Sequence, residues 1–257
     1  MKDFTAIALD DFPLVKEGDD IAEMIIATAK KNGVAFENGD IVVAAQKIFS
    51  KAEGKTVKLK DIIASQKAKE IAKAAGKSAK FVELVLRESR RVLKATSDIL
   101  LVEDKRGLVC INAGIDKSNV KGRGNFTLLP ENPDISAEKC RRKIEKLTGK
   151  KVAVIICDTF SRPFRRGQVN IAIGIAGIKP FKDYRGKRDL FGYVLKVKNT
   201  AVVDEIASAA ELLMGQGKEA VPVVIFKRLK NYVEFCEECN SNELCISEKE
   251  DLFKDTL

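Results

Sequence analysis

The sequence predicts an α+β fold of mixed helices and strands. Apolar residues repeat at helical spacing in some segments, while short unbroken apolar runs indicate buried strands, and the two kinds do not follow a regular βαβ order. The chain has 257 residues, 45% of them hydrophobic, which suffices for one large domain or two closely joined ones. It shows no internal repeat and no flexible linker.

Two glycine-containing segments superficially suggest nucleotide-binding folds, and both fail on spacing. The segment AAGKS at 74–78 lacks the first glycine of a phosphate-binding P-loop, because that position is Ile71, and it follows a helix rather than a strand. Gly76 is therefore predicted to end a helix. Gly174 and Gly177 lack the G-x-G-x-x-G spacing of a Rossmann fold and are predicted to allow close backbone packing.

The first half of the chain contains both helical and strand patterns. Residues 12–18 are extended, Asp19 and Asp20 can cap a helix at about 21–31, and Gly33 can stop it. The run IVVAAQKIF is predicted to be a buried strand. The elements predicted after it are helices at 65–75 and 79–94, strands at 98–103 and 107–111, and a polar loop at 112–134.

The second half centres on the run VAVIIC at 152–157, the most apolar strand pattern in the protein. A polar loop at 158–168 follows it and leads into the glycine-rich apolar run IAIGIAGI. The other predicted elements are helices at 136–148 and 202–214, a last core strand at 222–226, and a polar, acidic, peripheral tail from 231.

Composition excludes several classes of chemistry. The chain has no His, which rules out Ser–His–Asp and Cys–His catalysis and the commonest ligand of catalytic zinc. The net charge of +9 fits a lysine-rich surface, and it also fits attraction of polyanionic substrates. A clustered basic stripe with stacking aromatic residues is missing, so no nucleic-acid partner is expected.

The cysteines and the N-terminus indicate a cytoplasmic protein. Cys110, Cys140 and Cys157 stand alone in apolar or helical stretches, which suits reduced thiols better than a disulfide framework. No signal peptide and no membrane-spanning run is expected. Three further cysteines lie in the tail, where a zinc site and incidental thiols on a peripheral helix are both open readings: Cys236, Cys239 and Cys245.

Polar side chains follow two of the predicted strands. Asn112, Asp116, Ser118 and Asn119 come after the strand at 107–111, and Asp158 comes directly after VAVIIC. Carboxylate, amide and hydroxyl oxygens are the ligands that Mg²⁺ and Mn²⁺ prefer. The alternative for each aspartate is that it caps a turn.

The loop after Asp158 carries Arg162, Arg165 and Arg166, whose planar groups can grip phosphate or carboxylate. The alternative is an exposed charged loop. A glycine-rich turn at 214–217 can bring backbone N–H groups close to phosphate. The residues by themselves thus indicate a metal-dependent enzyme that acts on phosphorylated anions.

Along most of its length the chain resembles the coenzyme F420-0:glutamate ligase family. The matching stretches occur in the family's order from residue 12 to about 226: FPLVKEGDD, GDIVVAAQKIFSKAEGK, VCINAGIDKSNV, LLPENPDISAEKCRRKI, VIICDTFSRPFRRGQVNIAIGIAGIKPFKDYRGKRDLFGYVL and VVDEIASAAELLMGQGKEAVP. The resemblance implies largely antiparallel sheets in two interleaved lobes at 1–230, a peripheral tail at 231–257, and a homodimer.

For function, the resemblance implies that the protein adds L-glutamate to F420-0 with GTP as co-substrate. It also implies two divalent ions, Mg²⁺ or Mn²⁺, and K⁺ as a further ion. The γ-phosphoryl group would pass to the terminal carboxylate of F420-0, and the amine of glutamate would displace phosphate from the acyl phosphate. A second, γ-linked glutamate can follow. Such chemistry needs cations and Lys or Arg but no protein nucleophile.

The resemblance also assigns roles to residues of this chain. The expected metal ligands are Asp116, Asp158, Thr159 and Gln216. The expected nucleotide contacts are Phe12, Pro13, Leu14, Val15, Gln46, Lys47, Lys51, Asn119, Met214, Gly215, Gln216, Gly217, Lys218, Glu219, Ala220 and Val221. The residues expected to act in catalysis are Asp116, Asp158, Lys51, Arg162 and Arg165, of which the two arginines rest on the chemistry of their side chains.

The chain departs from the family pattern at Ser161, where glycine is frequent, at Lys227–Arg228, and throughout the tail. Three alternatives therefore remain open at this point. They are a ligase of the same fold with a different carboxylate acceptor or amino acid, a non-catalytic nucleotide-binding homologue, and an RNA-binding protein.

Overall fold

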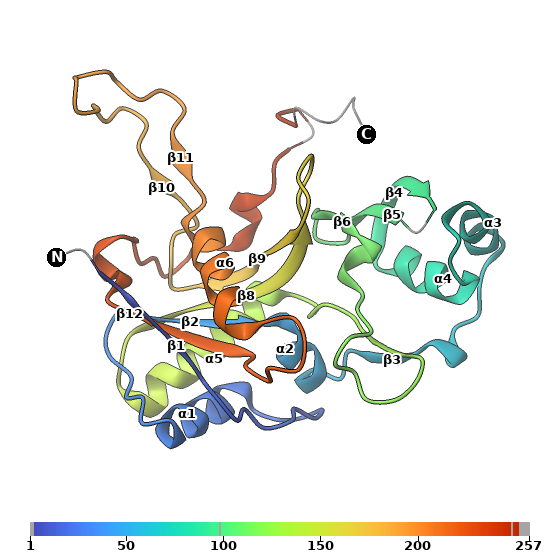
Figure 1. The fold of residues 1–257 in the computed structure, drawn as a ribbon, viewed down its shortest axis with the longest axis horizontal. Coiled ribbons are helices and arrows are strands. Elements are labelled where there is room, and N and C mark those ends of the chain that lie inside the picture. Colours follow the sequence, from blue (N-terminus) through green and yellow to red (C-terminus); the bar gives the residue numbers. More distant parts are fainter. Residues whose placement is uncertain (1–2, 98, 248, 252–257) are drawn as a thin grey trace.

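The computed structural model describes residues 3–97, 99–247 and 249–251, and it confirms the α+β prediction. Residues 1–2, 98, 248 and 252–257, which belong to the predicted domain, strand and tail, lie outside the described residues. A larger lobe surrounds a five-stranded sheet, and a smaller lobe, built mainly from the second quarter of the chain, lies to one side of it (Figure 1).

The five-stranded sheet has the order β1-β12-β2-β8-β9. Its strands are β1 Thr5–Ala8, β12 Val223–Lys227, β2 Asp40–Ala45, β8 Val152–Ser161 and β9 Gln168–Ala176. Only β2 and β8 run parallel among the described strands, with Ala45 opposite Cys157, and all other neighbours are antiparallel. The carboxyl ends of β2 and β8 therefore reach the same edge of the sheet.

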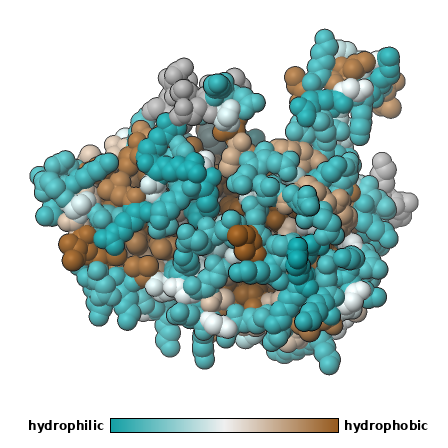
Figure 2. Space-filling view, turned by 180° about the vertical axis from the view of Figure 1, so that it is seen from behind, coloured by the Kyte–Doolittle hydropathy of each residue, from teal (hydrophilic) through white to brown (hydrophobic). Residues whose placement is uncertain are grey.

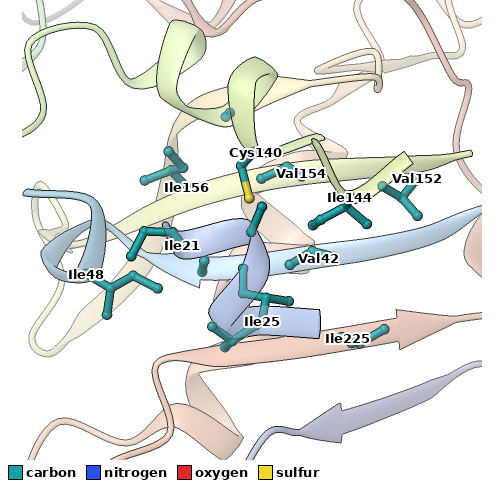
Figure 3. Packing of buried hydrophobic residues seen from close by; sticks show 14 of the residues in the cluster. Ile21, Ile25, Val42, Ile48, Cys140, Ile144, Val152, Val154, Ile156 and Ile225 are labelled. Carbon is teal, nitrogen blue, oxygen red and sulfur yellow. The ribbon is translucent and has the colours of Figure 1, made fainter. Parts of the chain in front are cut away.

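Each face of this sheet has its own hydrophobic core, because side chains alternate along a strand. Val42 and Ala44 face α1 (Ile21–Lys31) and α5 (Pro133–Thr148), as the packing around Ile25, Val42 and Val154 shows (Figure 3). Ile41 and Val43 face the opposite side, where α6 (Val202–Met214) packs. Burying one such aliphatic side chain contributes about 1.5–3 kcal/mol, so the sheet is fixed from both sides.

The smaller lobe packs two helices against a three-stranded sheet of order β4-β5-β6. Its elements are α3 Gln66–Ala75, α4 Ala79–Arg87, β4 Ser89–Thr96, β5 Ile99–Asp104 and β6 Val109–Ile111. The remaining elements are α2 Gln46–Ala52, β3 Thr56–Lys58, β7 Asn125–Thr127, β10 Lys182–Asp183, β11 Asn199–Thr200 and the 3-10 turns Leu59–Asp61, Asn112–Gly114, Leu229–Asn231 and Ser241–Leu244. β3 pairs with β7 where the two lobes join.

Several predicted element ends are confirmed by their caps. The Asp20 carboxylate accepts a hydrogen bond from the N–H of Glu23 at 3.0 Å and begins α1. Gly76 has the left-handed conformation at the end of α3, as a helix stop requires. The predicted close packing at Gly174 is confirmed as well, since a Cβ there would lie 2.5 Å from the backbone of Pro133 in α5.

Two predicted elements are wrong in part. The helix predicted at 79–94 ends at Arg87, and Ser89–Thr96 instead form β4, because pairing with β5 outweighs the helical spacing of the apolar residues. The strand predicted at 41–49 ends at Ala45, and Gln46 begins α2. In both cases an unbroken apolar pattern conceals a change of element.

Other boundaries move by a few residues. α5 begins at Pro133 rather than at 136, because the Asn132 side chain caps its first turn and proline suits the first helical position. β8 extends to Ser161, beyond the predicted end at 157, because Asp158–Ser161 continue to pair with β9. Asp98, the first residue of the strand predicted at 98–103, lies outside the described residues.

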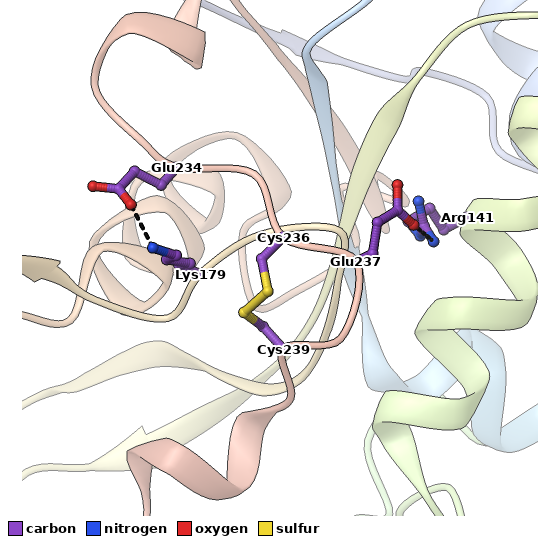
Figure 4. The surroundings of a disulfide bond; sticks show 6 residues. All are labelled: Arg141, Lys179, Glu234, Cys236, Glu237 and Cys239. Carbon is purple, nitrogen blue, oxygen red and sulfur yellow. Dashed lines mark hydrogen bonds and ion pairs between the residues drawn. A yellow bond between two sulfur atoms is a disulfide. The ribbon is translucent and has the colours of Figure 1, made fainter.

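The structure of the tail contradicts both predictions for its cysteines, a zinc site and incidental thiols on a helix. Cys236 and Cys239 form a disulfide in a segment without regular structure (Figure 4). Between them, Glu237 binds the buried guanidinium of Arg141 at 2.7 Å, which also pairs with Glu138 and Glu145. This joins the tail to α5 of the larger lobe.

A long arm at 180–200 projects from the larger lobe, with β10 and β11 at its base (Figure 1). Apolar side chains gather at its tip (Figure 2), where Leu190 and Phe191 are 97% and 96% exposed. No helix in the described part of the chain is both long enough and apolar enough to cross a membrane.

Gly174→Ala should destabilise the protein by about 2–3 kcal/mol, more than its control, because the added methyl group would push α5 away from β9. Gly124→Ala is the control, since its Cβ would enter open space and only its left-handed backbone is penalised, by about 1 kcal/mol. Urea unfolding measures both. An equal loss in the two variants would show that the contact with Pro133 is not tight.

Candidate active site

The candidate site begins where the two parallel strands end. Gln46 and Lys47 follow β2 directly, and Asp158 and Thr159 lie near the end of β8. The buried Gln46 donates a hydrogen bond to the Asp158 carboxylate and accepts one from Ser50 at 2.6 Å. The floor of the site is thus attached directly to the sheet.

A loop from the smaller lobe brings Asp116 to the same place. The backbone of Asp116 pairs with Thr127, which fixes the loop against β7. Lys47 donates hydrogen bonds to the Asp116 carboxylate and to the Ser118 hydroxyl, both at 2.7 Å. Asp116 therefore joins Asp158 across the boundary between the two lobes.

The third part of the site is the turn after α6. The Gln216 amide donates to the Thr159 hydroxyl at 3.0 Å and also to the Glu211 carboxylate. The Thr159 hydroxyl donates to the Asn170 side chain at 3.1 Å. Sequence reasoning missed Glu211 and Asn170. An Asn within an otherwise apolar strand is a signal that could have indicated Asn170, which is buried.

Two cavities meet at this point. The first, of about 390 Å³, is lined by every residue predicted to contact nucleotide, including Phe12–Val15, Lys47, Lys51, Asn119 and the 214–221 turn. The second, of about 300 Å³, lies between the smaller lobe and the β8–β9 hairpin. Four residues line both cavities, and they are the four predicted metal ligands, namely Asp116, Asp158, Thr159 and Gln216.

The two arginines predicted to act in catalysis lie elsewhere. Arg162 and Arg165 are in the turn of the β8–β9 hairpin and line neither cavity. Arg162 donates hydrogen bonds to backbone carbonyls of the same turn, those of Arg166 and Gly167. The structure thus brings together all the predicted site residues except these two.

The two carboxylates have opposite pKa shifts. Burial raises the pKa of Asp158 to about 7, and the negative charge of Asp116 adds to this, against the hydrogen bonds from Thr159 and Gln46 and the charge of Lys47. Burial also raises the pKa of Asp116, but hydrogen bonds from Lys47 and Ser118 outweigh it and hold that pKa below its ordinary value. A neighbouring cation would favour the ionised form of both.

Two lysines on one face of α2 point to an anion site in the first cavity. Lys47 and Lys51 are one helical turn apart, and Lys51 donates to the backbone carbonyl of Asn119 at 2.8 Å. Burial and then the charge of Lys47 lower the pKa of Lys51. An anion bound between them would relieve this repulsion.

The donor set at the junction fits a hard divalent cation. Asp116 and Asp158 supply carboxylates, Thr159 a hydroxyl and Gln216 an amide oxygen, and all four are oxygen donors. The described residues hold no cluster of three or more His, Cys, Asp and Glu side chains placed for a metal. Mg²⁺ or Mn²⁺ would therefore keep water or substrate oxygens among its ligands, as is usual beside phosphates.

Comparison with known proteins decides the family. The family model described as F420-0:Gamma-glutamyl ligase matches residues 11–228. The chain belongs to this family. The match includes both lobes and every residue at the junction of the two cavities.

Individual members of the family match over nearly their whole length. A protein named coenzyme F420:L-glutamate ligase from Archaeoglobus fulgidus is 47% identical, over 97% of this chain and 96% of its own. Proteins of the same name from Methanothermobacter thermautotrophicus and Methanocaldococcus jannaschii are 46% and 44% identical, over 86% and 84% of this chain and 87% and 85% of theirs. The resemblance stated from the sequence is confirmed.

The affinity for Mn²⁺ should fall about tenfold between pH 8 and pH 6, because the raised pKa of Asp158, about 7, means that a proton competes with the metal below that pH. Titration of the nucleotide-free protein with Mn²⁺, followed by electron paramagnetic resonance of the free ion, measures this. Asp158→Asn should bind weakly with little pH dependence over the same range, since the pKa of Asp116 lies below its ordinary value. Equal wild-type affinity at both pH values would contradict the assignment of Asp158.

Proposed function

We propose that the protein is a GTP-dependent ligase that joins L-glutamate to the terminal carboxylate of F420-0. The observation that carries the proposal is that two cavities of different charge share one wall made of Asp116, Asp158, Thr159 and Gln216. A reaction between two bound substrates needs such a meeting point. The description of the family names F420-0, the names of the relatives add L-glutamate, and GTP is taken from the family resemblance of the sequence.

The first cavity has the properties of a nucleotide site. Lys47 and Lys51 offer ammonium groups to phosphates. In the turn Gly215–Gly217, the N–H of Gly217 donates to the Glu219 carboxylate at 2.8 Å, and a phosphate would take the place of that carboxylate. The segment Phe12–Val15 supplies an apolar rim, with the side chain of Leu14 86% exposed. A purine base can lie on such a rim while its phosphates extend toward the junction.

In the proposed reaction, a carboxylate oxygen of F420-0 attacks the γ-phosphorus of GTP, the bond to the β-phosphate oxygen breaks, and GDP leaves. The glutamate nitrogen then attacks the acyl carbon, the bond from that carbon to the phosphate oxygen breaks, and phosphate and a proton leave. Lys47 and Lys51 would hold the phosphoryl charge, and Gln216 and Thr159 would position the groups between the cavities. A divalent cation bound by Asp116 and Asp158 would neutralise phosphate charge.

The same chemistry supports a second addition. The γ-carboxylate of the first glutamate can take the place of the original carboxylate, so that a second, γ-linked glutamate follows by the same two steps. Both cavities are partly open to solvent, which leaves room for a growing product.

A mass-spectrometric ligation assay with GTP, Mn²⁺, L-glutamate and F420-0 tests the proposal. We expect a mass gain of one or two glutamyl residues that requires both GTP and metal. Asp158→Asn should lose at least a hundredfold in turnover yet remain folded and become more stable by on the order of 1 kcal/mol, because a buried carboxylate with a raised pKa is removed.

Asp61→Asn, at an exposed carboxylate of the smaller lobe, is the matched control and should keep wild-type turnover. Absence of product from the wild-type protein, with GTP binding intact, would rule out F420-0 or glutamate as substrate and favour another acceptor.

We further propose that the protein is a homodimer and that the arm at 180–200 makes the contact. Leu190, Phe191 and Val197 are at least 89% exposed, and an apolar tip on a two-stranded arm is unfavourable in water unless it is covered. A second copy of the chain, the partner implied by the family resemblance, offers a symmetric way to cover it.

Phe191→Asp should convert the dimer to a monomer, because a charge at the covered tip cannot be buried without a partner. Sedimentation equilibrium should give twice the 28.3 kDa chain mass for the wild-type protein and the single chain mass for the variant. Lys187→Asp is the control, because it places the same aspartate on the same arm at a position that already carries a charge. This variant should remain dimeric. A wild-type monomer would contradict the proposal.

A further inference from the structure

The second cavity differs from the first in charge. The first contains Lys47, Lys51 and Lys218 beside the acidic residues Asp116, Asp158 and Glu219, whereas no Lys or Arg lines the second among the described residues. The charged groups of the second cavity are the carboxylates at the junction, Asp116 and Asp158. The second cavity is therefore unsuited to phosphates and suited to a ligand that presents an amine to this end.

One side chain in the wall of this cavity lacks a hydrogen-bond partner. Asn112 Oδ1 is the one buried side-chain oxygen or nitrogen in the described part of the chain that accepts or donates no hydrogen bond. Leaving such an acceptor unpaired costs about 1–3 kcal/mol. An unpaired polar group that persists in a folded protein calls for a functional explanation.

The backbone holds Asn112 in place at a further cost. Asn112 and Ala113 have φ values of 55° and 54°, and Gly114 follows with 68°, so three successive residues are left-handed. Gly114 packs against Leu129 so closely that a Cβ would lie 2.6 Å from its side chain. Strained turns of this kind occur at functional sites.

We infer that the second cavity is the amino-acid pocket and that Asn112 Oδ1 accepts a hydrogen bond from the attacking amine of the substrate, an inference that rests on the proposed ligase function. The Asn112 amide is held by no other side chain, so rotation about its Cβ–Cγ bond can turn the oxygen toward the cavity without breaking a hydrogen bond. An amide oxygen pairs with N–H donors, which fits an amine and not a carboxylate.

The opposite end of the cavity suits the carboxylates of an amino acid. Ser161 and Gln168, the last pair of the β8–β9 hairpin, supply a hydroxyl and an amide N–H donor, and their side chains are 3.4 Å apart. Arg162, Arg165 and Arg166 lie in the turn between these two residues and do not line the cavity, so neutral donors alone would hold the carboxylates there. Such a ligand would thus lie with its amine toward the junction and its carboxylates toward the hairpin.

Two substitutions at Asn112 distinguish the role of its side-chain oxygen from that of its backbone conformation, because Gly and Asp both tolerate a left-handed conformation. Asn112→Gly should raise the KM for L-glutamate about tenfold and leave the KM for GTP within twofold of wild type. Asn112→Asp keeps an acceptor oxygen and should stay within threefold for both. Asn125→Gly removes an amide outside both cavities and is the control.

An unchanged KM for L-glutamate in Asn112→Gly, or an equal rise in both KM values, would overturn the inference. So would an Asn112→Asp variant as weak as Asn112→Gly. This split between substrates is a readout that a general loss of structure would not produce.

A binding measurement separates this inference from the proposed function. L-Glutamate added to the complex with GDP and Mn²⁺ should raise the Tm of the wild-type protein but not that of Asn112→Gly. This result without any ligation product would contradict the proposed acceptor and support the pocket. Product from the wild type, with equal Tm shifts in both proteins, would contradict the pocket and support the function.

Discussion

The site depends on the parallel pairing of β2 with β8. Every other neighbouring pair among the described strands is antiparallel, so adjacent strand ends elsewhere lie at opposite edges of their sheet. With Ala45 opposite Cys157, the residues that follow both strands emerge side by side from a core that is closed on both faces. Gln46 and Asp158 are in hydrogen-bond contact for this reason. Ligands beyond the carboxyl ends of parallel strands are a general feature of such sheets.

The unfavourable electrostatics of the site follow from the same arrangement. The sheet holds Asp158 where burial opposes its charge, and the smaller lobe adds Asp116 beside it. Lys47 hydrogen-bonds to only one of the two carboxylates, that of Asp116, and its charge does not outweigh the burial of Asp158. Lys47 in turn opposes the charge of Lys51. The folded protein therefore keeps a site whose charges are balanced best when a cation and a polyanion are present. Stability given up at a site in this way is a common cost of binding.

Much of the fold could be predicted from the sequence, where local chemistry decides it. Asp20 begins one helix and Gly76 ends another by capping, and Gly174 contacts α5 as expected. The errors at 46–49 and 88–94 arise where apolar spacing fits two structures and pairing with a distant strand decides between them. Asp116, Asp158 and the turn at 214–217 could be singled out from the residues alone, because they follow predicted strands or a helix. Phe12–Val15 and Lys51 could be identified only through the family resemblance, because they are distant in sequence from the other site residues. Asn170 and Glu211 escaped notice because their roles depend on contacts across β9 and α6.

Hydrogen bonds across the first cavity also constrain how the two lobes can move. Asn119, from the smaller lobe, accepts a hydrogen bond from Lys51 and donates one to the carbonyl of Gly217 at 3.1 Å, so it connects α2 and the turn after α6 across the first cavity. A phosphate that recruits Lys51 competes for the first of these bonds. Under the proposed function, nucleotide binding would therefore act on the loop that carries Asp116, three residues earlier, through Asn119. That loop begins at Asn112 in the wall of the second cavity. A ligand in the first cavity could therefore change the position of Asn112 without any movement of the sheet.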